Sequence, residues 1–209
     1  MGHYFDFDDS IKSQERLISY EINGLKMSLI SDNGVFSKNE LDEGSRTLLK
    51  TILPLGLKGK ILDLGAGYGP IGLTIAMSLP NTSVTLVDIN PRAVSLCQKN
   101  ADLHGLSQRV TCLQSDIFSS VEGPYDSIVV NPPIRAGKKV TYKMYEGAYQ
   151  HLIDGGTFYF VIRKAQGASS ASNYVKEIFG NITLLARHKG FHVYVARKNT
   201  NQEKESLNA

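Results

Sequence analysis

The sequence predicts an α/β protein with a mostly parallel, seven-stranded sheet that is covered by helices on both faces. Two observations carry this prediction. Short apolar segments typical of buried strands alternate with segments of helical periodicity between residues 60 and 179, and such alternation is typical of parallel sheets. The last two strand-like segments are separated only by His188-Lys189-Gly190. Three residues cannot form a parallel crossover, so these two strands must be antiparallel if they pair.

Residues 1–55 predict an N-terminal extension that packs on the main domain. Asn23-Gly24 separates two runs of equal length, Leu17–Ile22 and Leu25–Ile30. Asn-Gly in this position is the strongest short signal for a β-hairpin, because both turn residues need positive φ. Apolar residues then recur at helical spacing over Asp42–Leu53, and the proline that follows predicts the end of this helix.

Residues 56–197 form the predicted main domain, followed by a polar tail at 198–209. Its strands are predicted from short runs rich in β-branched and aromatic residues, and its helices from apolar periodicity between turn residues. The predicted strands are Lys60–Leu64, Ser83–Val87, Arg109–Gln114, Asp126–Val130, Gly156–Arg163, Ile182–Arg187 and Phe191–Arg197. The predicted helices are Pro70–Leu79, Pro91–His104, Lys139–Ile153 and Ser169–Phe179.

Composition excludes several classes of protein. Hydrophobic residues make up 42% and charged residues 21% of the 209-residue chain, as in globular proteins. The apolar runs are far shorter than the roughly 18 residues of a membrane span, and the acidic start MGHYFDFDDS has no apolar secretion signal. We therefore expect a cytoplasmic protein with no membrane partner. Cys97 and Cys112 lie in apolar segments without a Cys or His cluster, which predicts buried thiols and no metal site. The net charge of +3 is too small to identify a nucleic-acid binder.

Three glycines follow the first strand of the main domain, in Asp63-Leu64-Gly65-Ala66-Gly67-Tyr68-Gly69-Pro70. Glycine permits a sharp turn and lets a ligand lie against the main chain. Gly67–Gly72 also fits the dinucleotide pattern G-x-G-x-x-G, which would place a pyrophosphate at the start of the next helix. The carboxylate of Asp63 suits a cation, such as an amino group or a sulfonium, better than this anion.

Two further acids follow the next two strands. Asp88 ends the second strand, where a carboxylate can accept both ribose hydroxyls of a nicotinamide or an adenosyl ligand. Asn90 is the better N-cap for the helix that follows. Asp116 comes just after the third strand and could accept an exocyclic amino hydrogen of adenine. Because ligands of open α/β sheets bind at the carboxyl ends of the strands, these acids predict a nucleoside site there.

The tetrapeptide Asn131-Pro132-Pro133-Ile134 directly follows the fourth strand. Two prolines cannot continue a central strand, and they stiffen the chain beside the predicted ligand. The side-chain carbonyl of Asn131 and the backbone carbonyl of Pro132 offer two acceptors for the two hydrogens of one amino group. This arrangement would direct the nitrogen lone pair towards an electrophile. The structural alternative is a simple end to the strand.

The motifs DLGAGYG, VDIN, QSDIF and NPPI, in this order on such a chain, resemble the class I S-adenosylmethionine-dependent methyltransferases, whose fold is Rossmann-like. The NPP motif resembles the subgroup that methylates amino nitrogens conjugated to a planar system. Within it, the chain resembles the small-subunit (16S) ribosomal RNA guanine-N2 methyltransferases, on the segments GVFS at 34–37, LDEGS at 41–45, NPPIRAGK and KAQGA at 164–168. Longer members of that family carry an additional, catalytically silent copy of the domain before the active one, whereas this sequence has only the active-type copy.

The resemblance implies a metal-free enzyme that transfers a methyl group from S-adenosylmethionine to guanine N2 of small-subunit ribosomal RNA and releases S-adenosylhomocysteine. The partner would be ribosomal RNA or the small ribosomal subunit. The implied catalytic residues are Asn131, Pro132 and Pro133. The implied cofactor-binding residues are Asp63, Gly65, Ala66, Gly67, Gly69, Asp88, Ile89, Asp116, Ile117 and Asn131.

The predicted RNA-binding residues lie beside the tetrapeptide. Ile134 stands where many amino methyltransferases carry an aromatic residue that stacks on the target base, so Phe36 is predicted to stack instead, with Phe191 behind it. Basic residues that could meet the RNA backbone are Arg135, Lys138, Lys139 and Lys143, with Arg163, Lys164, Arg187 and Lys189 as an extension. The alternatives are a methyltransferase of adenine N6 or of a glutamine amide, a nicotinamide-dependent oxidoreductase, and a non-catalytic RNA-binding module.

Overall fold

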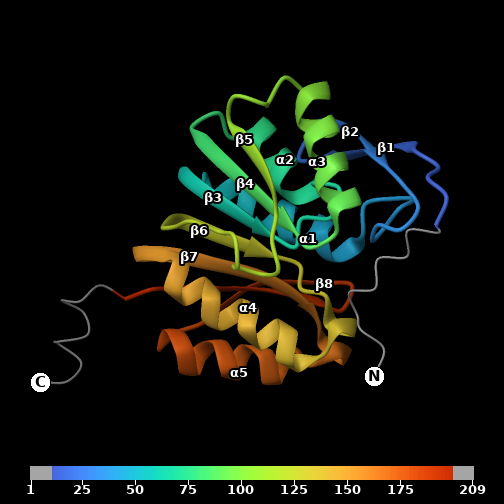
Figure 1. Ribbon diagram of the computed structural model, residues 1–209. Helices are drawn as coiled ribbons and strands as arrows, with labels where there is room; N and C mark the ends of the chain where they lie inside the picture. Colours follow the sequence, from blue (N-terminus) through green and yellow to red (C-terminus); the bar gives the residue numbers. More distant parts are fainter. Residues whose placement is uncertain (1–10, 200–209) are drawn as a thin grey trace, which may run out of the picture.

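The computed structural model describes residues 11–199. Residues 1–10 and 200–209, the outer parts of the predicted extension and tail, lie outside the described residues. The described chain forms a two-stranded sheet, β1-β2, and a seven-stranded sheet in the order β5-β4-β3-β6-β7-β9-β8 (Figure 1). Neighbouring strands from β5 to β7 are parallel, whereas β9 is antiparallel to both β7 and β8. The predicted fold class, with its terminal antiparallel hairpin, is confirmed.

The large sheet and its helices follow the predicted order along the chain. The strands are β3 (Gly59–Leu64), β4 (Thr82–Asp88), β5 (Val110–Gln114), β6 (Tyr125–Val130), β7 (Leu152–Arg163), β8 (Thr183–His188) and β9 (Phe191–Arg197). The helices are α1 (Glu43–Ile52), α2 (Pro70–Ser78), α3 (Pro91–Leu103), α4 (Lys138–His151) and α5 (Ala168–Phe179). Single 3₁₀ turns lie at Leu53–Leu55, Ile134–Ala136 and Lys164–Gln166.

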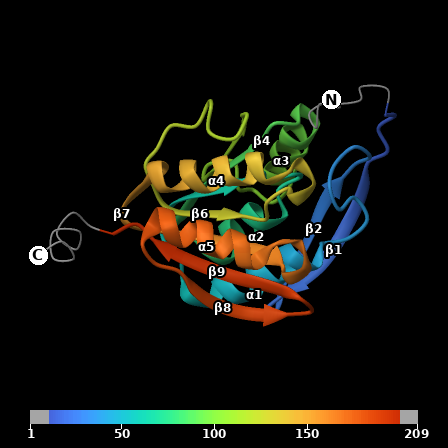
Figure 2. The same cartoon turned by 90° about the horizontal axis from the view of Figure 1, so that it is seen from below.

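Helices cover both faces of the large sheet, as predicted. Because successive strand residues point to opposite faces, Ile61 packs in one hydrophobic cluster with α1, α2 and α3, while Leu62 packs in a second cluster with α4 and α5. Figures 1 and 2 show α4 and α5 side by side, and Figure 1 shows them on the face of the sheet away from α2 and α3. This three-layer packing leaves the carboxyl ends of the parallel strands at one edge of the sheet.

The N-terminal hairpin packs against the first of these two layers. It consists of β1 (Arg16–Ile22) and β2 (Leu25–Ser31), and Asn23 and Gly24 both have positive φ, as the sequence predicts. Figure 2 shows the hairpin at one side of the large sheet. The buried Asn100 of α3 binds both the N–H and the carbonyl of Ile30, at 2.7 and 2.9 Å. The division of the chain at residue 55 stays a prediction, because one hydrophobic cluster includes both parts.

The largest difference from the predicted boundaries, most of which shift by one residue, lies between α4 and β7. Helix α4 ends at His151 and β7 begins at Leu152, whereas the sequence predicts a helix to Ile153 and a strand only from Gly156. Leu152 lies opposite Tyr125 and Thr157 lies opposite Ser127, so β7 carries a bulge of extra residues before its regular part. A bulge interrupts the alternation of side chains, and the strand pattern in the sequence therefore begins only after it.

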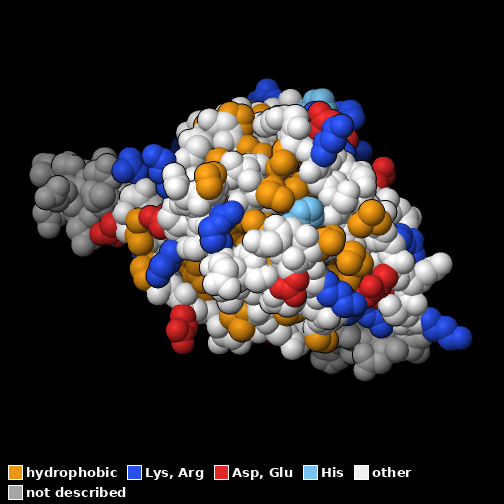
Figure 3. Space-filling model, turned by 90° about the horizontal axis from the view of Figure 1, so that it is seen from above, with side chains coloured by type: hydrophobic (Ala, Val, Ile, Leu, Met, Phe, Trp, Pro, Cys, Tyr) orange, Lys and Arg blue, Asp and Glu red, His pale blue; other side chains and the backbone are white. Residues whose placement is uncertain are grey.

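Several absences can be reported for the described residues 11–199. No helix there is long and apolar enough to cross a membrane, and no group of three His, Cys, Asp or Glu side chains is placed to hold a metal ion. Both cysteines are free thiols; Cys97 is buried, but Cys112 is only half-buried, because β5 is an edge strand. Figure 3 shows Lys and Arg side chains interspersed with acidic and apolar ones on one face of the molecule.

Candidate active site

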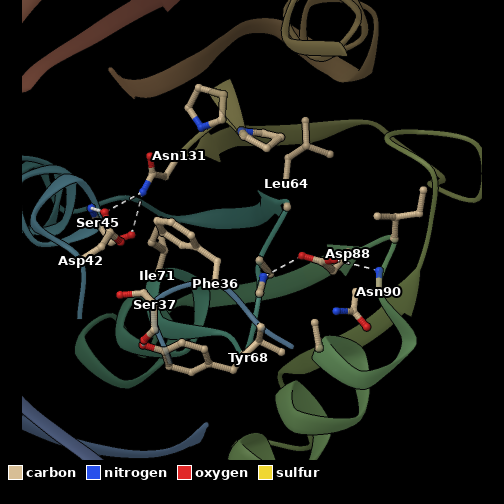
Figure 4. A pocket seen from close by; sticks show the side chains of 18 of the residues that line it. Phe36, Ser37, Asp42, Ser45, Leu64, Tyr68, Ile71, Asp88, Asn90 and Asn131 are labelled. Atoms are coloured by element: carbon tan, nitrogen blue, oxygen red, sulfur yellow. Dashed lines mark hydrogen bonds between the residues drawn. The ribbon is translucent and has the colours of Figure 1, made fainter. Parts of the chain in front are cut away.

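A cavity of about 680 Å³ opens at the carboxyl ends of the parallel strands. Its wall combines the glycine loop after β3, the end of β4, the segment after β5 and the Asn-Pro-Pro-Ile turn after β6. Residues 34–37, Asp42 and Ser45 complete the wall from the N-terminal part of the chain (Figure 4). Motifs that lie far apart in the sequence thus share one cavity, as expected for an open α/β sheet.

The glycine loop presents bare backbone to this cavity. The N–H groups of Gly65 and Ala66 both donate to the carbonyl of Val87, at 2.9 and 2.8 Å, which ties the loop to β4. Gly67 has a φ of +58°, and a Cβ built there would meet no heavy atom within 4 Å. A ligand can therefore approach the main chain at Gly67 closely.

Asp63 and Gly69 lie behind the loop and do not line the cavity. Gly69 is the N-cap of α2 with a φ of +94°, so its role in this structure is to start the helix. Asp63 is buried; its Oδ2 accepts a hydrogen bond from the Gly72 N–H at 2.7 Å, while its Oδ1 has no partner. Burial, with Asp88 nearby, raises the pKa of Asp63 to about 7. An unpartnered buried carboxylate oxygen is stabilised by a positive charge, so this residue fits a cationic ligand above the loop.

Asp88 lies half-buried on the cavity wall at the end of β4. Its Oδ2 accepts from the Gly67 N–H at 2.8 Å and its Oδ1 from the Asn90 N–H at 2.9 Å. Burial raises the pKa of Asp88, and these backbone hydrogen bonds act against that shift. The side chain of Asn90 accepts from the Arg92 N–H at 3.0 Å, which confirms Asn90 as the N-cap of α3. Asp88 is therefore not needed as the cap.

The segment after β5 forms another part of the wall, next to Ile89. Asp116 is exposed there, and its backbone N–H donates to the Ser119 hydroxyl oxygen at 3.1 Å. Ile117 is half-buried and has a φ of +54°, which is uncommon for a β-branched residue. Asp116 and Ile117 both line the cavity.

The Asn-Pro-Pro-Ile turn brings all four of its residues to the cavity wall. The amide nitrogen of Asn131 donates to Oδ1 of Asp42 at 3.0 Å and to the hydroxyl oxygen of Ser45 at 3.1 Å. No described residue donates to its carbonyl oxygen, and Figure 4 shows this oxygen on the side away from Asp42 and Ser45. Asn131 therefore offers an acceptor in a fixed direction. The sequence alone predicts no role for Asp42 or Ser45 at this site.

Aromatic side chains flank this acceptor. Phe36 is 71% exposed and lines the cavity, as do Ile134 and the half-buried Phe191. The loop that carries Phe36 is held by α3: the Asn90 amide donates to the Gly34 carbonyl at 3.0 Å, and Arg92 donates to the Asn33 carbonyl at 2.8 Å. An exposed ring on an anchored loop is suited to stacking on a planar ligand.

The predicted basic residues do not all lie on the cavity wall. Arg135 and Arg163 line the cavity, whereas Lys138 is exposed at the start of α4. Lys139 and Lys143 line a separate, shallower depression that shares Asp116 and Ile117 with the cavity. The basic residues therefore extend from the rim of the cavity along one side of α4.

The fold and the site together define the predicted class, a class I S-adenosylmethionine-dependent methyltransferase. Residues 26–195 match the family described as "Methyltransferase small domain", and the chain belongs to this family.

Two relatives are similar to most of the chain. It is 39% identical over 198 residues to the "Uncharacterized protein YbxB" of Bacillus subtilis, covering 94% of this chain and 98% of that protein. It is 37% identical over 165 residues to the ribosomal RNA small subunit methyltransferase C of Mannheimia succiniciproducens, covering 77% of this chain and 48% of the relative. The chain thus spans about half the length of that relative.

A solved structure is similar over most of the chain. It is the Thermus thermophilus 16S rRNA N2 G1207 methyltransferase (RsmC) in complex with AdoMet and guanosine. The TM-score is 0.81 at 27% sequence identity, over 90% of this chain and 52% of that one. The predicted resemblance to small-subunit ribosomal RNA methyltransferases is confirmed at the level of family and fold.

Proposed function

We propose that this chain transfers a methyl group from S-adenosylmethionine to the N2 amino group of a guanine in small-subunit ribosomal RNA. The observation that carries the proposal is the orientation of Asn131, whose amide nitrogen is bound to Asp42 and Ser45. Its carbonyl oxygen is thereby left to accept a hydrogen from an amino group. The names of the similar proteins support the choice of guanine N2 and of small-subunit ribosomal RNA.

The residues around the glycine loop fit S-adenosylmethionine. This cofactor supplies a methyl group that is already activated by its sulfonium. Asp88 would accept the ribose hydroxyls, because both its oxygens lie at the strand end and are held by backbone N–H groups. The cofactor would lie against the bare backbone of Gly65, Ala66 and Gly67. Ile89 and Ile117 would contact its adenine ring, and Asp116 would accept a hydrogen from the adenine amino group. Asp63 would act from behind the loop through its charge, and Gly69 by starting α2.

The catalytic contribution of the protein is mainly one of position. Asn131 and the Pro132 carbonyl would hold the two amino hydrogens, so that the nitrogen lone pair points along the direction of transfer, and Pro133 would keep the turn rigid. The acceptor oxygens would also stabilise the positive charge that develops on the nitrogen. The amino proton can then leave to solvent, so this scheme requires no general base.

The target base would stack on Phe36, with Ile134 and Phe191 as apolar contacts. A paired guanine hides its amino group, so the target must be unpaired or flipped out of its helix. Arg135, Lys138, Lys139 and Lys143 would contact the RNA backbone on one side of the cavity. Ribosomal RNA or the small subunit is then the partner, and the cytoplasmic location predicted from the sequence stays a prediction.

The experiment is mass spectrometry of nucleosides from ribosomal RNA of a wild-type strain, a deletion strain, and the deletion strain complemented with wild-type protein or with Asn131→Ala. We expect N2-methylguanosine to fall in the deletion strain and to return only with the wild-type protein. Loss of N6-methyladenosine instead would assign adenine as the target. An unchanged set of modified nucleosides would contradict the proposal.

A further inference from the structure

We infer that Asp42 and Ser45 are positioning residues that fix the direction of the Asn131 side chain and strengthen its carbonyl oxygen as an acceptor. The effect of these residues on methyl transfer rests on the proposed function, whereas their hydrogen bonds to Asn131 do not depend on it. Both residues come from the N-terminal part of the chain, 89 and 86 positions before Asn131. The active site would therefore be incomplete without that part.

The amide nitrogen of Asn131 has no spare hydrogen. A side-chain amide carries two N–H donors, and those of Asn131 are directed to Asp42 at 3.0 Å and to Ser45 at 3.1 Å. A rotation of the amide by 180° would place its carbonyl oxygen against the carboxylate of Asp42, where two acceptors repel, and would turn two donors towards the cavity. An amino group is itself a donor, so only the observed orientation can bind it.

The two partners of this amide are themselves held in place. Oδ1 of Asp42 also accepts from the N–H groups of Gly44 and Ser45, at 2.9 and 3.2 Å, and so caps α1. Ser45 is buried in the first turn of this helix. A Cβ at Gly44 would lie 3.0 Å from Oδ1 of Asp42, 3.3 Å from Nδ2 of Asn131 and 3.1 Å from Phe191. The close contact of α1 with the turn thus depends on a glycine here.

The charge of Asp42 also acts on the Asn131 amide. A hydrogen bond from an amide N–H to a carboxylate is stronger than one to a neutral acceptor, and linked hydrogen bonds polarise one another in a low-dielectric site. The negative charge of Asp42 pulls the amide hydrogens towards itself, which increases the electron density on the carbonyl oxygen at the other end. A more strongly accepting oxygen favours a nitrogen on which positive charge develops.

The activity test is a double-mutant cycle. Asp42→Ala should slow single-turnover methyl transfer at least roughly tenfold, since loss of one charge-assisted hydrogen bond is enough for that change. Ser45→Ala should have a smaller effect in the same direction, and both variants should keep their S-adenosylmethionine affinity within a few-fold. In the Asn131→Ala background, Asp42→Ala should cost nothing further, because its effect passes through Asn131. Asp42→Asn, which retains an acceptor oxygen, should recover part of the rate.

A control variant separates positioning from a general change in the stability of α1. Thr51→Ala removes the hydrogen bond from the Thr51 hydroxyl to the Thr47 carbonyl (2.7 Å) in the same helix and touches neither Asn131 nor the cavity. It should change the free energy of unfolding without changing the rate of methyl transfer. A rate that falls with stability in Thr51→Ala as steeply as in Asp42→Ala would overturn the inference.

A nuclear magnetic resonance measurement decides the geometry without any activity. In protein labelled with ¹⁵N-asparagine, the Asn131 side-chain resonances are the pair that Asn131→Ala removes. We expect their hydrogen exchange to be at least roughly tenfold faster in the Asp42→Ala/Ser45→Ala double variant, whereas Thr51→Ala leaves it unchanged. Unchanged exchange in the double variant would refute the inference. A wild-type protein that shows the expected exchange but methylates no RNA would refute only the proposed function.

Discussion

Asp88→Ala is expected to weaken S-adenosylmethionine binding at least tenfold while the fold stays intact. The carboxylate lies half-buried at the end of β4, and the N–H groups of Gly67 and Asn90 hold one oxygen each, at 2.8 and 2.9 Å. Its remaining acceptor capacity is directed to the cavity. Two charge-assisted hydrogen bonds to ribose hydroxyls would be lost, each on the order of 1.5–3 kcal/mol. Since about 1.4 kcal/mol is a factor of ten in affinity, either bond alone would give the expected loss.

Isothermal titration calorimetry with S-adenosylmethionine and with S-adenosylhomocysteine measures this change. Asp154→Ala is the matched control, because Asp154 is an exposed carboxylate near the amino end of β7, whereas the cavity lies at the carboxyl ends of the parallel strands. Thermal unfolding followed by circular dichroism checks that Asp88→Ala is folded. Affinity equal to that of the wild type in a folded Asp88→Ala protein would refute the assignment of Asp88 to the ribose.

Three further predictions concern the turn, the RNA surface and the buried acid. Asn131→Ala should keep cofactor affinity within a few-fold but raise the barrier to methyl transfer by roughly 2.7–4 kcal/mol; near-normal single-turnover rates would leave the turn as a simple end to β6. Lys138→Ala/Lys139→Ala should flatten the plot of log RNA affinity against log salt by roughly 1.4 units, if each lysine neutralises one phosphate of a single strand; parallel lines in filter-retention assays would mean a solvated surface. Burial raises the pKa of Asp63 from 3.8 to about 7. Between these two pH values the native state therefore binds more protons at this residue than the unfolded state does. As a result, Asp63 makes the free energy of unfolding fall as the pH rises. Asp63→Asn should remove that part of the pH dependence in urea unfolding between about pH 4 and pH 7, and an identical slope in both proteins would contradict the assignment.

Much of the fold could be predicted because its signals are local. The Asn23-Gly24 turn, the alternation of strands with helices, and the antiparallel pairing of the last two strands each depend on neighbouring residues, and all three are confirmed. The link between β8 and β9 is two residues long and not three, because His188 pairs with Phe191. The carboxyl ends of parallel strands meet at one edge of a sheet. For this reason the motifs after β3, β4, β5 and β6 could be assigned to one site before their distances were known.

The parts that could not be predicted depend on contacts between distant residues. The bulge at the start of β7 is defined by its partner Tyr125 and not by its own sequence. No local sequence pattern indicates that the carboxylate of Asp42 binds the side chain of Asn131, 89 positions away. The same holds for Arg92, whose guanidinium binds the carbonyl of Asn33, 59 positions away. The glycine motif predicts Asp63 and Gly69 as cofactor-binding residues, but both lie behind the loop and do not line the cavity. Which side of the loop they occupy depends on how α2 packs, and the motif does not indicate this.

The central claim is that the amino group of a guanine is the methyl acceptor at Asn131. The most direct test is incubation of the protein with unmodified small-subunit ribosomal RNA and S-adenosylmethionine that carries a deuterated methyl group, followed by mass spectrometry of the nucleosides. We predict that the labelled methyl group is found as N2-methylguanosine, and that Asn131→Ala abolishes most of this signal. Label on adenine N6, or label on guanine N2 that is independent of Asn131, would contradict the account.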